Sequence, residues 1–533
     1  MIMKKAKAFY DDILSKKLFY LPILFFAIVG YSFSIYNRTI SIDDLARDYY
    51  IGGGNPFFNG RWGTAIWNNL IGISVVLDPL IDRFSALLLL VLASFLLCYL
   101  LFSISGVENI IPYTITASSF ITFPLINEIW EYTGANFMVC GNLCLVSIGT
   151  VYLREYVLQD PTPKKLLLSS LFFILPASSY ETAIFYYISL VNIVILLEAI
   201  ESNDNSLNFK DWARNIIIYF IPIVVALIIR IIVSQLIMVL FRMPYNPGGA
   251  STGILWFSDN VFHVLKCMFA FNIVHYVLYA LIYFPITIFL LVSFLFILYI
   301  LLYKNRSKVV VLSIFVFLSL FSQSIIQGFE LSYRHAQTIS LFVAFTVFLY
   351  SNLSICRYWK YCVYSLFFLL CWHQSVYMNR ILGLNNLRSD NEMAILGEIG
   401  YRITSEYEKK PVVFIGHYQI SKSIENFVSV RENTWNGDLF FLLYEKFITK
   451  IERPYRYVGS NVHPATWEYY QIHDFFSYCG YDIDVIPNYL YGEDVEKEEV
   501  IKNLSTQIAN EKHLKPYQIY DSGEYLIVNF NSR

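Results

Sequence analysis

Charged residues are scarce in this chain. Only 15% of its 533 residues are Asp, Glu, Lys or Arg, whereas a soluble domain carries about 25%. This scarcity excludes an ordinary soluble protein, because a surface that faces water needs charge. The formal net charge is −2, so the chain has no basic excess and no nucleic-acid partner is expected.

Paired cysteines are also missing. The chain has eight cysteines, none of them in a Cys-x-x-Cys pair, and most lie in or beside apolar runs. This pattern excludes a disulfide framework and a zinc site, and it predicts buried free thiols. No internal repeat and no low-complexity segment is found.

Long apolar runs are what the sequence has in abundance. Hydrophobic residues make up 56% of the chain, and several runs approach or exceed the roughly 20 residues that span a bilayer. A polytopic α-helical membrane protein is therefore predicted. Apolar periodicity and polar breaks indicate about eleven transmembrane helices, at 18–36, 84–104, 110–127, 136–153, 166–178, 181–199, 215–240, 273–301, 309–328, 337–354 and 361–377.

Two segments leave alternatives open. Pro176-Ala177-Ser178-Ser179 predicts either a tight turn between two helices or a kink in one long helix. Residues 63–80 contain Asn68, Asn69 and Asp78-Pro79, which favours an interfacial or re-entrant helix over a span.

The charges beside the apolar runs predict an orientation. If the N-terminus is cytoplasmic, the inner segments hold about twice as many Lys and Arg residues as the outer loops. The inner set is mostly lysine and the outer set mostly arginine, which suits bidentate binding of phosphate. The first loop, residues 37–83, is therefore expected on the outer face, together with loops 241–272 and 329–336.

The composition changes at about residue 380. Residues 391–410 and 438–451 read as helices, and residues 411–416, 481–485 and 525–530 read as strands. Alternating helices and strands predict a small α/β domain of roughly 140 residues. The predicted domains are thus 1–380 in the membrane and 381–533 outside it, on the outer face.

The first outer loop carries the densest group of charges, Ser-Ile-Asp-Asp-Leu-Ala-Arg-Asp at 41–48 and Gly-Arg-Trp at 60–62. If 41–50 is helical, Asp44, Arg47 and Asp48 share one face. Asp43 or Asp44 could act as a general base toward a hydroxyl, and an arginine could bind phosphate. The alternative is an Asp N-cap with ion pairs along the helix, which needs no ligand.

Four weaker candidates complete the set. Tyr180-Glu181 begins an apolar run, and Arg334-His335 predicts either an anion site at a helix N-terminus or an interfacial anchor. Arg230, inside an apolar run, is expected to face the bundle or to reach toward the membrane surface. Trp62 and Trp256 offer aromatic faces for a sugar, although tryptophan is also common at membrane interfaces.

The acidic pair in the first outer loop resembles the GT-C-type glycosyltransferases. Ser-Ile-Asp-Asp-Leu-Ala-Arg followed by Gly60-Arg61-Trp62 resembles, more narrowly, the serotype-converting O-antigen glucosyltransferases of bacteria and bacteriophages. The resemblance covers roughly residues 1–380. It implies an inverting glucosyltransferase of the bacterial inner (plasma) membrane, with its C-terminal domain in the periplasm.

The roles of the residues follow from that resemblance. The donor would be undecaprenyl-phosphate glucose, made by a separate synthase and moved across the membrane by a flippase, and the acceptor a sugar of lipid-linked O-antigen. Asp44 or Asp43 would be the base, with Asp44 favoured. Arg61, Arg334 and His335 would bind the donor phosphate, with Arg47, Asp48, Glu181 and Tyr180 in support and Trp62 and Trp256 at the acceptor sugar. No cofactor is expected, although the aspartates leave room for a divalent cation.

Two rival functions remain open. A membrane polysaccharide polymerase would also have outer arginines in a many-helix bundle, but it would not need an acidic pair in the first loop. A lipid or polysaccharide transporter would show broken helices in two related halves, which the sequence does not show.

Overall fold

The computed structural model describes most of the helical part of the chain and a portion of the tail. The described residues are 2–37, 60–71, 79–123, 130, 135–157, 162–202, 209–242, 256, 260–269, 284–301, 307–328, 337–352, 357–415, 476, 480–486 and 518–529. They form two compact units, and each is described by itself. Unit 1 contains the described residues up to Gly383, and unit 2 contains those from Leu384 onward.

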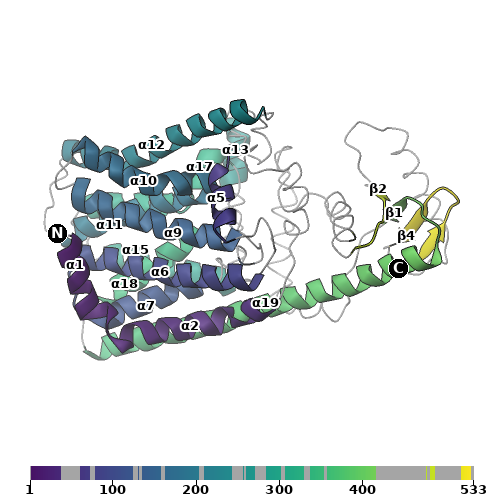
Figure 1. Ribbon diagram of the computed structural model, residues 1–533. Coiled ribbons are helices and arrows are strands. Elements are labelled where there is room, and N and C mark those ends of the chain that lie inside the picture. The colour runs from purple at the N-terminus through teal and green to yellow at the C-terminus, as the bar shows by residue number, and fades with distance from the viewer. Residues whose placement is uncertain are drawn as a thin grey trace. The chain divides into compact units, whose positions relative to one another are not determined.

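Unit 1 is helical throughout its described residues (Figure 1). Most of its helices lie side by side with their ends aligned, while the short helix α1 lies across one end of them. The elements are α1 Ile2–Phe9, the π-helical turn η1 Tyr10–Leu14, α2 Lys17–Tyr36, α5 Trp62–Leu70, α6 Pro79–Ser105, α7 Ile110–Thr122, α9 Ala135–Tyr152, the π-helical turn η3 Leu153–Val157, α10 Pro163–Ser179, α11 Thr182–Glu201, α12 Phe209–Phe241, α13 Val261–Phe269, α15 Phe284–Leu301, α16 Ser307–Ser319, α17 Ser322–Gln327, α18 Gln337–Ser351 and α19, which begins at Arg357.

Several of these helices suit a membrane. Among the described residues, five are long and apolar enough to cross one: Lys17–Tyr36, Leu80–Ser105, Ala135–Glu155, Thr182–Glu201 and Ile216–Phe241. Four shorter apolar helices accompany them, at Ile110–Thr122, Leu291–Leu301, Ser307–Ser319 and Gln337–Ser351. A mostly helical membrane protein is thus supported, while the number of eleven spans stays a prediction.

Some element boundaries differ from those predicted. Helix α6 begins at Pro79 and not at residue 84, because proline suits the first helical position and polar residues interrupt an apolar run without ending a helix. The expected segments 361–377 and 391–410 belong to one helix, α19, Arg357–Glu406, since no proline lies between them. The expected span 309–328 is broken into α16 and α17.

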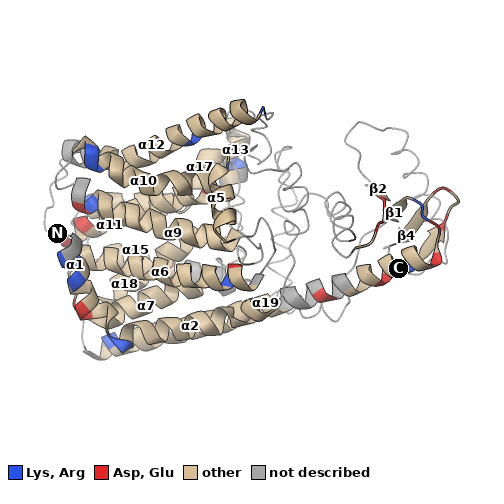
Figure 2. Ribbon diagram, viewed as in Figure 1, with Lys and Arg blue, Asp and Glu red and all other residues tan. Residues whose placement is uncertain are grey.

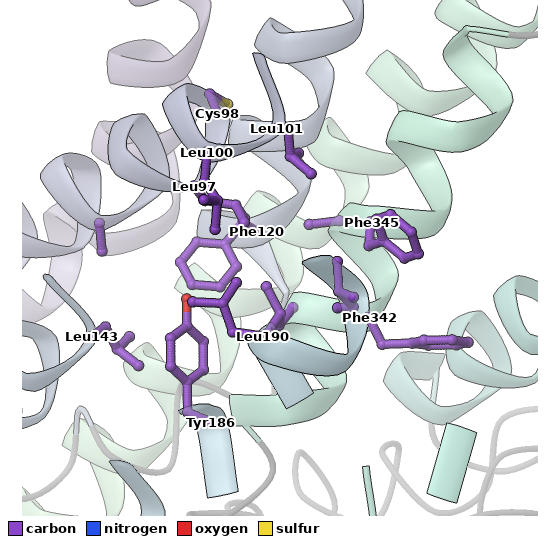
Figure 3. Packing of buried hydrophobic residues seen from close by; sticks show 14 of the residues in the cluster. Leu97, Cys98, Leu100, Leu101, Phe120, Leu143, Tyr186, Leu190, Phe342 and Phe345 are labelled. Atoms are coloured by element: carbon purple, nitrogen blue, oxygen red, sulfur yellow. The ribbon is translucent and has the colours of Figure 1, made fainter. Parts of the chain in front are cut away.

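Helix α11 is the central helix of unit 1. It packs against α6, α9, α16 and α18, and most of its residues are buried. Tyr186 of α11 points toward Phe120 of α7, with ring centroids 6.5 Å apart, and Phe342 and Phe345 of α18 lie nearby in the same core (Figure 3). The tight packing of α11 therefore fixes the positions of the residues at its two ends.

Residues of charged type lie mostly toward the two ends of the helices, and the ribbon between them is largely uncharged (Figure 2). At one end, Lys5 and Arg154 pair with the buried carboxylate of Glu155 at 2.9 and 3.1 Å, and Arg154 also pairs with Glu198 at 2.6 Å. We call these four residues the Glu155 cluster. It fixes α1 to η3 and to the C-terminal end of α11.

Unit 2 contains a four-stranded sheet. The strands are β1 Val412–Ile415, β2 Val485–Ile486, β3 Ile519–Asp521 and β4 Leu526–Asn529, in the order β2-β1-β4-β3. Strand β1 is parallel to β2 and β4, and β3 is antiparallel to β4. Ile399 and Ile403 of α19 pack against the sheet in one apolar cluster, as an α/β arrangement requires.

The second strand is shorter than predicted. Residues 481–485 were expected to be extended, but β2 contains only Val485 and Ile486, which pair with Val412 and Val413. Tyr481 instead packs its ring edge-on against Phe476, at a centroid distance of 6.1 Å. The predicted helix 438–451 lies outside the described residues.

Candidate functional site

The turn between α10 and α11 resolves the first alternative left open by the sequence. Residues 163–179 and 182–201 form two helices, joined by Tyr180 in an extended conformation and by Glu181 at the N-cap of α11. The backbone N–H of Ala183 donates to the Tyr180 carbonyl at 3.1 Å. The tight turn lies at Tyr180 and Glu181, directly after the expected segment, because residues 176–179 form the last turn of α10. It places Glu181 at the N-terminal end of the central helix.

Glu181 bridges two arginines. Its Oε2 lies 2.8 Å from Nη2 of Arg61, and its Oε1 lies 3.0 Å from Nη2 of Arg230. The Arg61 guanidinium also lies over the Tyr180 ring, 5.4 Å from its centroid, which is within the range of a cation–π contact. We call Arg61, Glu181 and Arg230 the Glu181 cluster. Its formal charge is +1.

Arg230 makes two further hydrogen bonds, both to backbone carbonyls. Its Nε donates to the Gly60 carbonyl at 3.2 Å, and its Nη1 donates to the Ala177 carbonyl at 3.0 Å. Ala177 lies in the last turn of α10, where carbonyls have no partner within the helix and the helix dipole is negative. Arg230 therefore satisfies the end of α10 and holds the residue before Arg61.

The glycine of the Gly-Arg-Trp segment is needed for steric reasons. Gly60 has φ of +64°, a left-handed conformation that favours glycine, and an added Cβ would lie 3.1 Å from Oγ of Ser234 in α12. Gly63 follows in the first turn of α5, where a Cβ would lie 2.5 Å from the Oγ atoms of Ser178 and Ser179. Both glycines thus let this segment approach its neighbouring helices closely.

The cluster keeps Glu181 ionised. Burial by itself would raise the pKa of the carboxyl group, but the charges of Arg61 and Arg230 outweigh burial and lower the pKa to about 2. A carboxylate with so low a pKa is a poor proton acceptor near neutral pH. Glu181 is therefore suited to hold the arginines in place and not to act as a general base.

Two adjacent charges at the same end serve neighbouring helices. Asp82 accepts hydrogen bonds from Nδ2 of Asn136 at 3.0 Å and from the backbone N–H of Phe137 at 3.4 Å, at the start of α9. Arg83 donates to the carbonyls of Ser34 and Asn37 at 2.8 and 2.7 Å, at the end of α2. The acid thus faces a helix N-terminus and the arginine a helix C-terminus, as the helix dipole favours.

The tryptophans at this end have different surroundings. Nε1 of Trp67 donates to Oδ1 of Asn142 at 3.0 Å, and Nε1 of Trp256 donates to the Ile325 carbonyl at 2.8 Å. Trp62 begins α5 and is partly buried, and its Nε1 has no acceptor among the described residues. The Trp62 N–H group is thus buried without an acceptor among the described residues, whereas Trp256 has a partner.

The structure brings together only part of the predicted site. Arg61, Tyr180 and Glu181 meet in one place, with Trp62 next to Arg61 in the chain. Six predicted residues lie outside the described part of the chain, namely Asp43, Asp44, Arg47, Asp48, Arg334 and His335. Among the described residues, no group of three or more His, Cys, Asp and Glu side chains could hold a metal ion.

Three charged residues, Arg230, Asp82 and Arg83, make specific contacts that the sequence did not predict. Arg230 was expected to face the bundle or the membrane surface, and it faces the bundle. The sequence places Asp82 and Arg83 in the first loop, but they lie near the start of α6, with Asp82 in its first turn. The sequence signal was an acid and an arginine a few residues after the proline that begins α6. Charged side chains that are buried at a helix start need partners, so the pair could have been predicted to cap neighbouring helices.

Comparisons with known proteins agree with the resemblance carried by residues 41–62. No curated protein and no solved structure matches the chain significantly. One family model, described as glucosyl transferase GtrII, matches residues 32–351, which is more than half of the chain. The matched residues include Gly60, Arg61, Glu181 and Arg230. This chain belongs to the GtrII glucosyltransferase family.

Proposed function

We propose that this protein transfers glucose from undecaprenyl-phosphate glucose to a sugar hydroxyl of lipid-linked O-antigen, with inversion at the anomeric carbon. The reaction takes place at the periplasmic face of the inner membrane. The acceptor oxygen attacks C1 of glucose, and its proton passes to Asp44 or Asp43. The bond between C1 and the phosphate oxygen breaks, and its electron pair stays on the phosphate.

The observation that carries this proposal is the placement of Arg61. Its guanidinium is fixed by Glu181 and Tyr180 at the start of the central helix. In the sequence, Arg61 follows Asp43 and Asp44 by 18 and 17 positions. A fixed arginine, preceded in the sequence by two carboxylates, suits a reaction in which a phosphate leaves and a hydroxyl loses a proton.

The negative charge on the donor phosphate explains why more than one cationic side chain is useful in the site. A sugar phosphodiester carries one negative charge, and the departing phosphate monoester carries up to two. Arg61, with Arg334 and His335, would meet this growing charge, and electrostatic stabilisation of that kind is commonly the largest catalytic contribution. Trp62 and Trp256 would contact the acceptor sugar, while Arg47, Asp48, Tyr180 and Glu181 would support the charged groups.

Other proteins supply the donor. Nucleotide sugars stay in the cytoplasm, so a separate synthase would load glucose onto the lipid phosphate, and a flippase would move it to the periplasmic face. The N-terminus is then cytoplasmic and the domain from residue 381 periplasmic. No resident cofactor is needed for this reaction, although a divalent cation could assist the phosphate.

The test uses purified protein in lipid vesicles with undecaprenyl-phosphate glucose and lipid-linked O-antigen. Transfer of one hexose to the acceptor, measured by mass spectrometry, supports the proposal. Asp44→Asn or Asp43→Asn should lower kcat by about 10² to 10⁴. Longer O-antigen chains without added hexose would identify a polymerase instead, and movement of lipid without a new bond would identify a transporter.

A further inference from the structure

We propose that Arg230 is a positioning residue for Arg61, an inference that rests on the proposed function because it takes Arg61 as a ligand of the donor phosphate. Arg230 acts through two contacts, one with the backbone of Gly60 and one with the carboxylate of Glu181. It links α12 to the segment that begins α5.

Most of the hydrogen-bonding capacity of Arg230 is used within the protein. Each of its three guanidinium nitrogens donates to a protein acceptor, namely Gly60, Ala177 and Glu181, at 3.0 to 3.2 Å. These acceptors come from three different segments: the residue before Arg61, the last turn of α10 and the N-cap of α11. One side chain from α12 therefore joins all three.

The helix itself directs Arg230 toward the bundle. Tyr219, Ile223, Ala226 and Ser234 share its face at spacings of three or four residues, and all four are buried. The opposite face is exposed and apolar, as at Ile228 and Ile231. A guanidinium on the inner face of an apolar helix has to find polar partners there, because an unpaired charge is costly at that depth.

Two routes connect Arg230 to Arg61. Gly60 immediately precedes Arg61, so the hydrogen bond to its carbonyl fixes where the Arg61 backbone begins, and Ser234 adds a contact of 3.4 Å to the same carbonyl. Glu181 is shared: its Oε1 accepts from Arg230 at 3.0 Å and more weakly from Arg61 at 3.4 Å, and its Oε2 accepts from Arg61 at 2.8 Å. Loss of Arg230 would leave Glu181 free to turn toward Arg61 alone and would shift the Arg61 side chain.

The shift should appear mainly in kcat. The negative charge on the donor phosphate grows as the bond to C1 breaks, so a misplaced Arg61 loses more interaction in the transition state than in the bound donor. Displacement of a catalytic group by about 1 Å can cost about 100-fold in rate. We therefore expect Arg230→Gln to lower kcat about 10- to 100-fold, with a smaller change in KM for the donor.

The experiment measures transfer by the full-length protein in lipid vesicles, with undecaprenyl-phosphate glucose as donor. The variants are Arg230→Gln, Arg230→Lys and the control Arg154→Gln, which removes a comparable buried arginine from the Glu155 cluster at the other end of the helices. Arg230→Lys should recover part of kcat, because one ammonium group can reach Glu181 but cannot hold three acceptors. The control should change kcat less than about 3-fold, since it is remote from the reaction.

A double-mutant cycle separates positioning from general stability. If Arg230 acts through Glu181, the effects of Arg230→Gln and Glu181→Gln on kcat will be less than additive. Additive effects, or a wild-type kcat in Arg230→Gln, would overturn the inference while transfer by the wild-type protein leaves the proposed function intact. If Arg230→Gln does not fold, Ser234→Ala is the alternative variant. It removes the weaker contact to Gly60 together with the hydrogen bond from the Ser234 hydroxyl to the Arg230 carbonyl. It should still lower kcat 2- to 5-fold by this partial loosening of Arg61, on the order of 0.4–1 kcal/mol. An unchanged kcat in Ser234→Ala would then overturn it.

Discussion

Arg61 and Glu181 form an ion pair across 120 positions of the chain, with Nη2 2.8 Å from Oε2. The pair joins the N-cap of α5 to the N-cap of the central helix α11. Both side chains are largely shielded from solvent, at 24% and 19% exposed. The contact is therefore stronger than an ordinary surface pair, and removing one partner leaves the other charge partly buried.

Glu181→Gln should lower both stability and transfer. Two arginines would then face each other without a carboxylate, so we expect a loss of about 2–4 kcal/mol in the free energy of unfolding. Transfer should fall at least about 10-fold because Arg61 is no longer fixed. Tryptophan fluorescence during heating in detergent reports the first effect, and the vesicle assay reports the second.

Glu198→Gln is the matched control for that change. Glu198 also pairs with an arginine, Arg154, but at the other end of α11 and at 34% exposure. Its replacement should lower the melting temperature less and leave transfer near the wild-type rate. Equal losses of transfer in both variants would mean that Glu181 contributes only to stability.

Acid should weaken the protein through Glu181. Its pKa in the folded protein is about 2, below its value in an unfolded chain, so the folded state is favoured whenever the carboxyl group is ionised. This contribution, up to ~3 kcal/mol, is fully present above about pH 5 and is lost as the pH falls toward 2. Melting temperatures measured from pH 7 to pH 3 should fall less steeply in Glu181→Gln than in the wild type, and parallel curves would contradict the assignment.

Gly63→Ala should prevent α5 from docking correctly. The new Cβ would lie 2.5 Å from two serine hydroxyl oxygens and 2.9 Å from the Leu175 carbonyl, so the helix must move. Overpacking of this kind costs about 1–3 kcal/mol, and the displacement of Arg61 should reduce transfer as well. Gly397→Ala, in an open position of α19, should leave melting temperature and transfer unchanged or slightly improved.

Asp82→Ala should destabilise the packing of α6 against α9. The change leaves Nδ2 of Asn136 and the N–H of Phe137 without the carboxylate that accepts from them. Unsatisfied buried donors cost about 1–3 kcal/mol each. Asp82→Asn keeps one acceptor oxygen and should recover about half of the loss in melting temperature. No recovery would show that the charge, and not the hydrogen bonds, matters at this position.

Much of the fold was readable from apolar patterning. The run at 18–36 corresponds to α2, Lys17–Tyr36, and the run at 181–199 to α11, Thr182–Glu201. The strand expected at 411–416 is β1, Val412–Ile415. Errors arose where polar residues interrupt a run without breaking a helix, as within α19, because hydropathy reports the environment of a segment and not its hydrogen bonding.

The sequence by itself determined the class of protein, the apolar segments and the family, since composition, run length and the short motifs at 41–47 and 60–62 are local properties. Only the tertiary structure decided how the charges are used. Arg230 and Glu181 are 49 positions apart, and helical periodicity can place each on a face but cannot name its partner. Which arginine a buried carboxylate meets depends on how α5, α10, α11 and α12 pack, and that packing is set by contacts between residues distant in the chain.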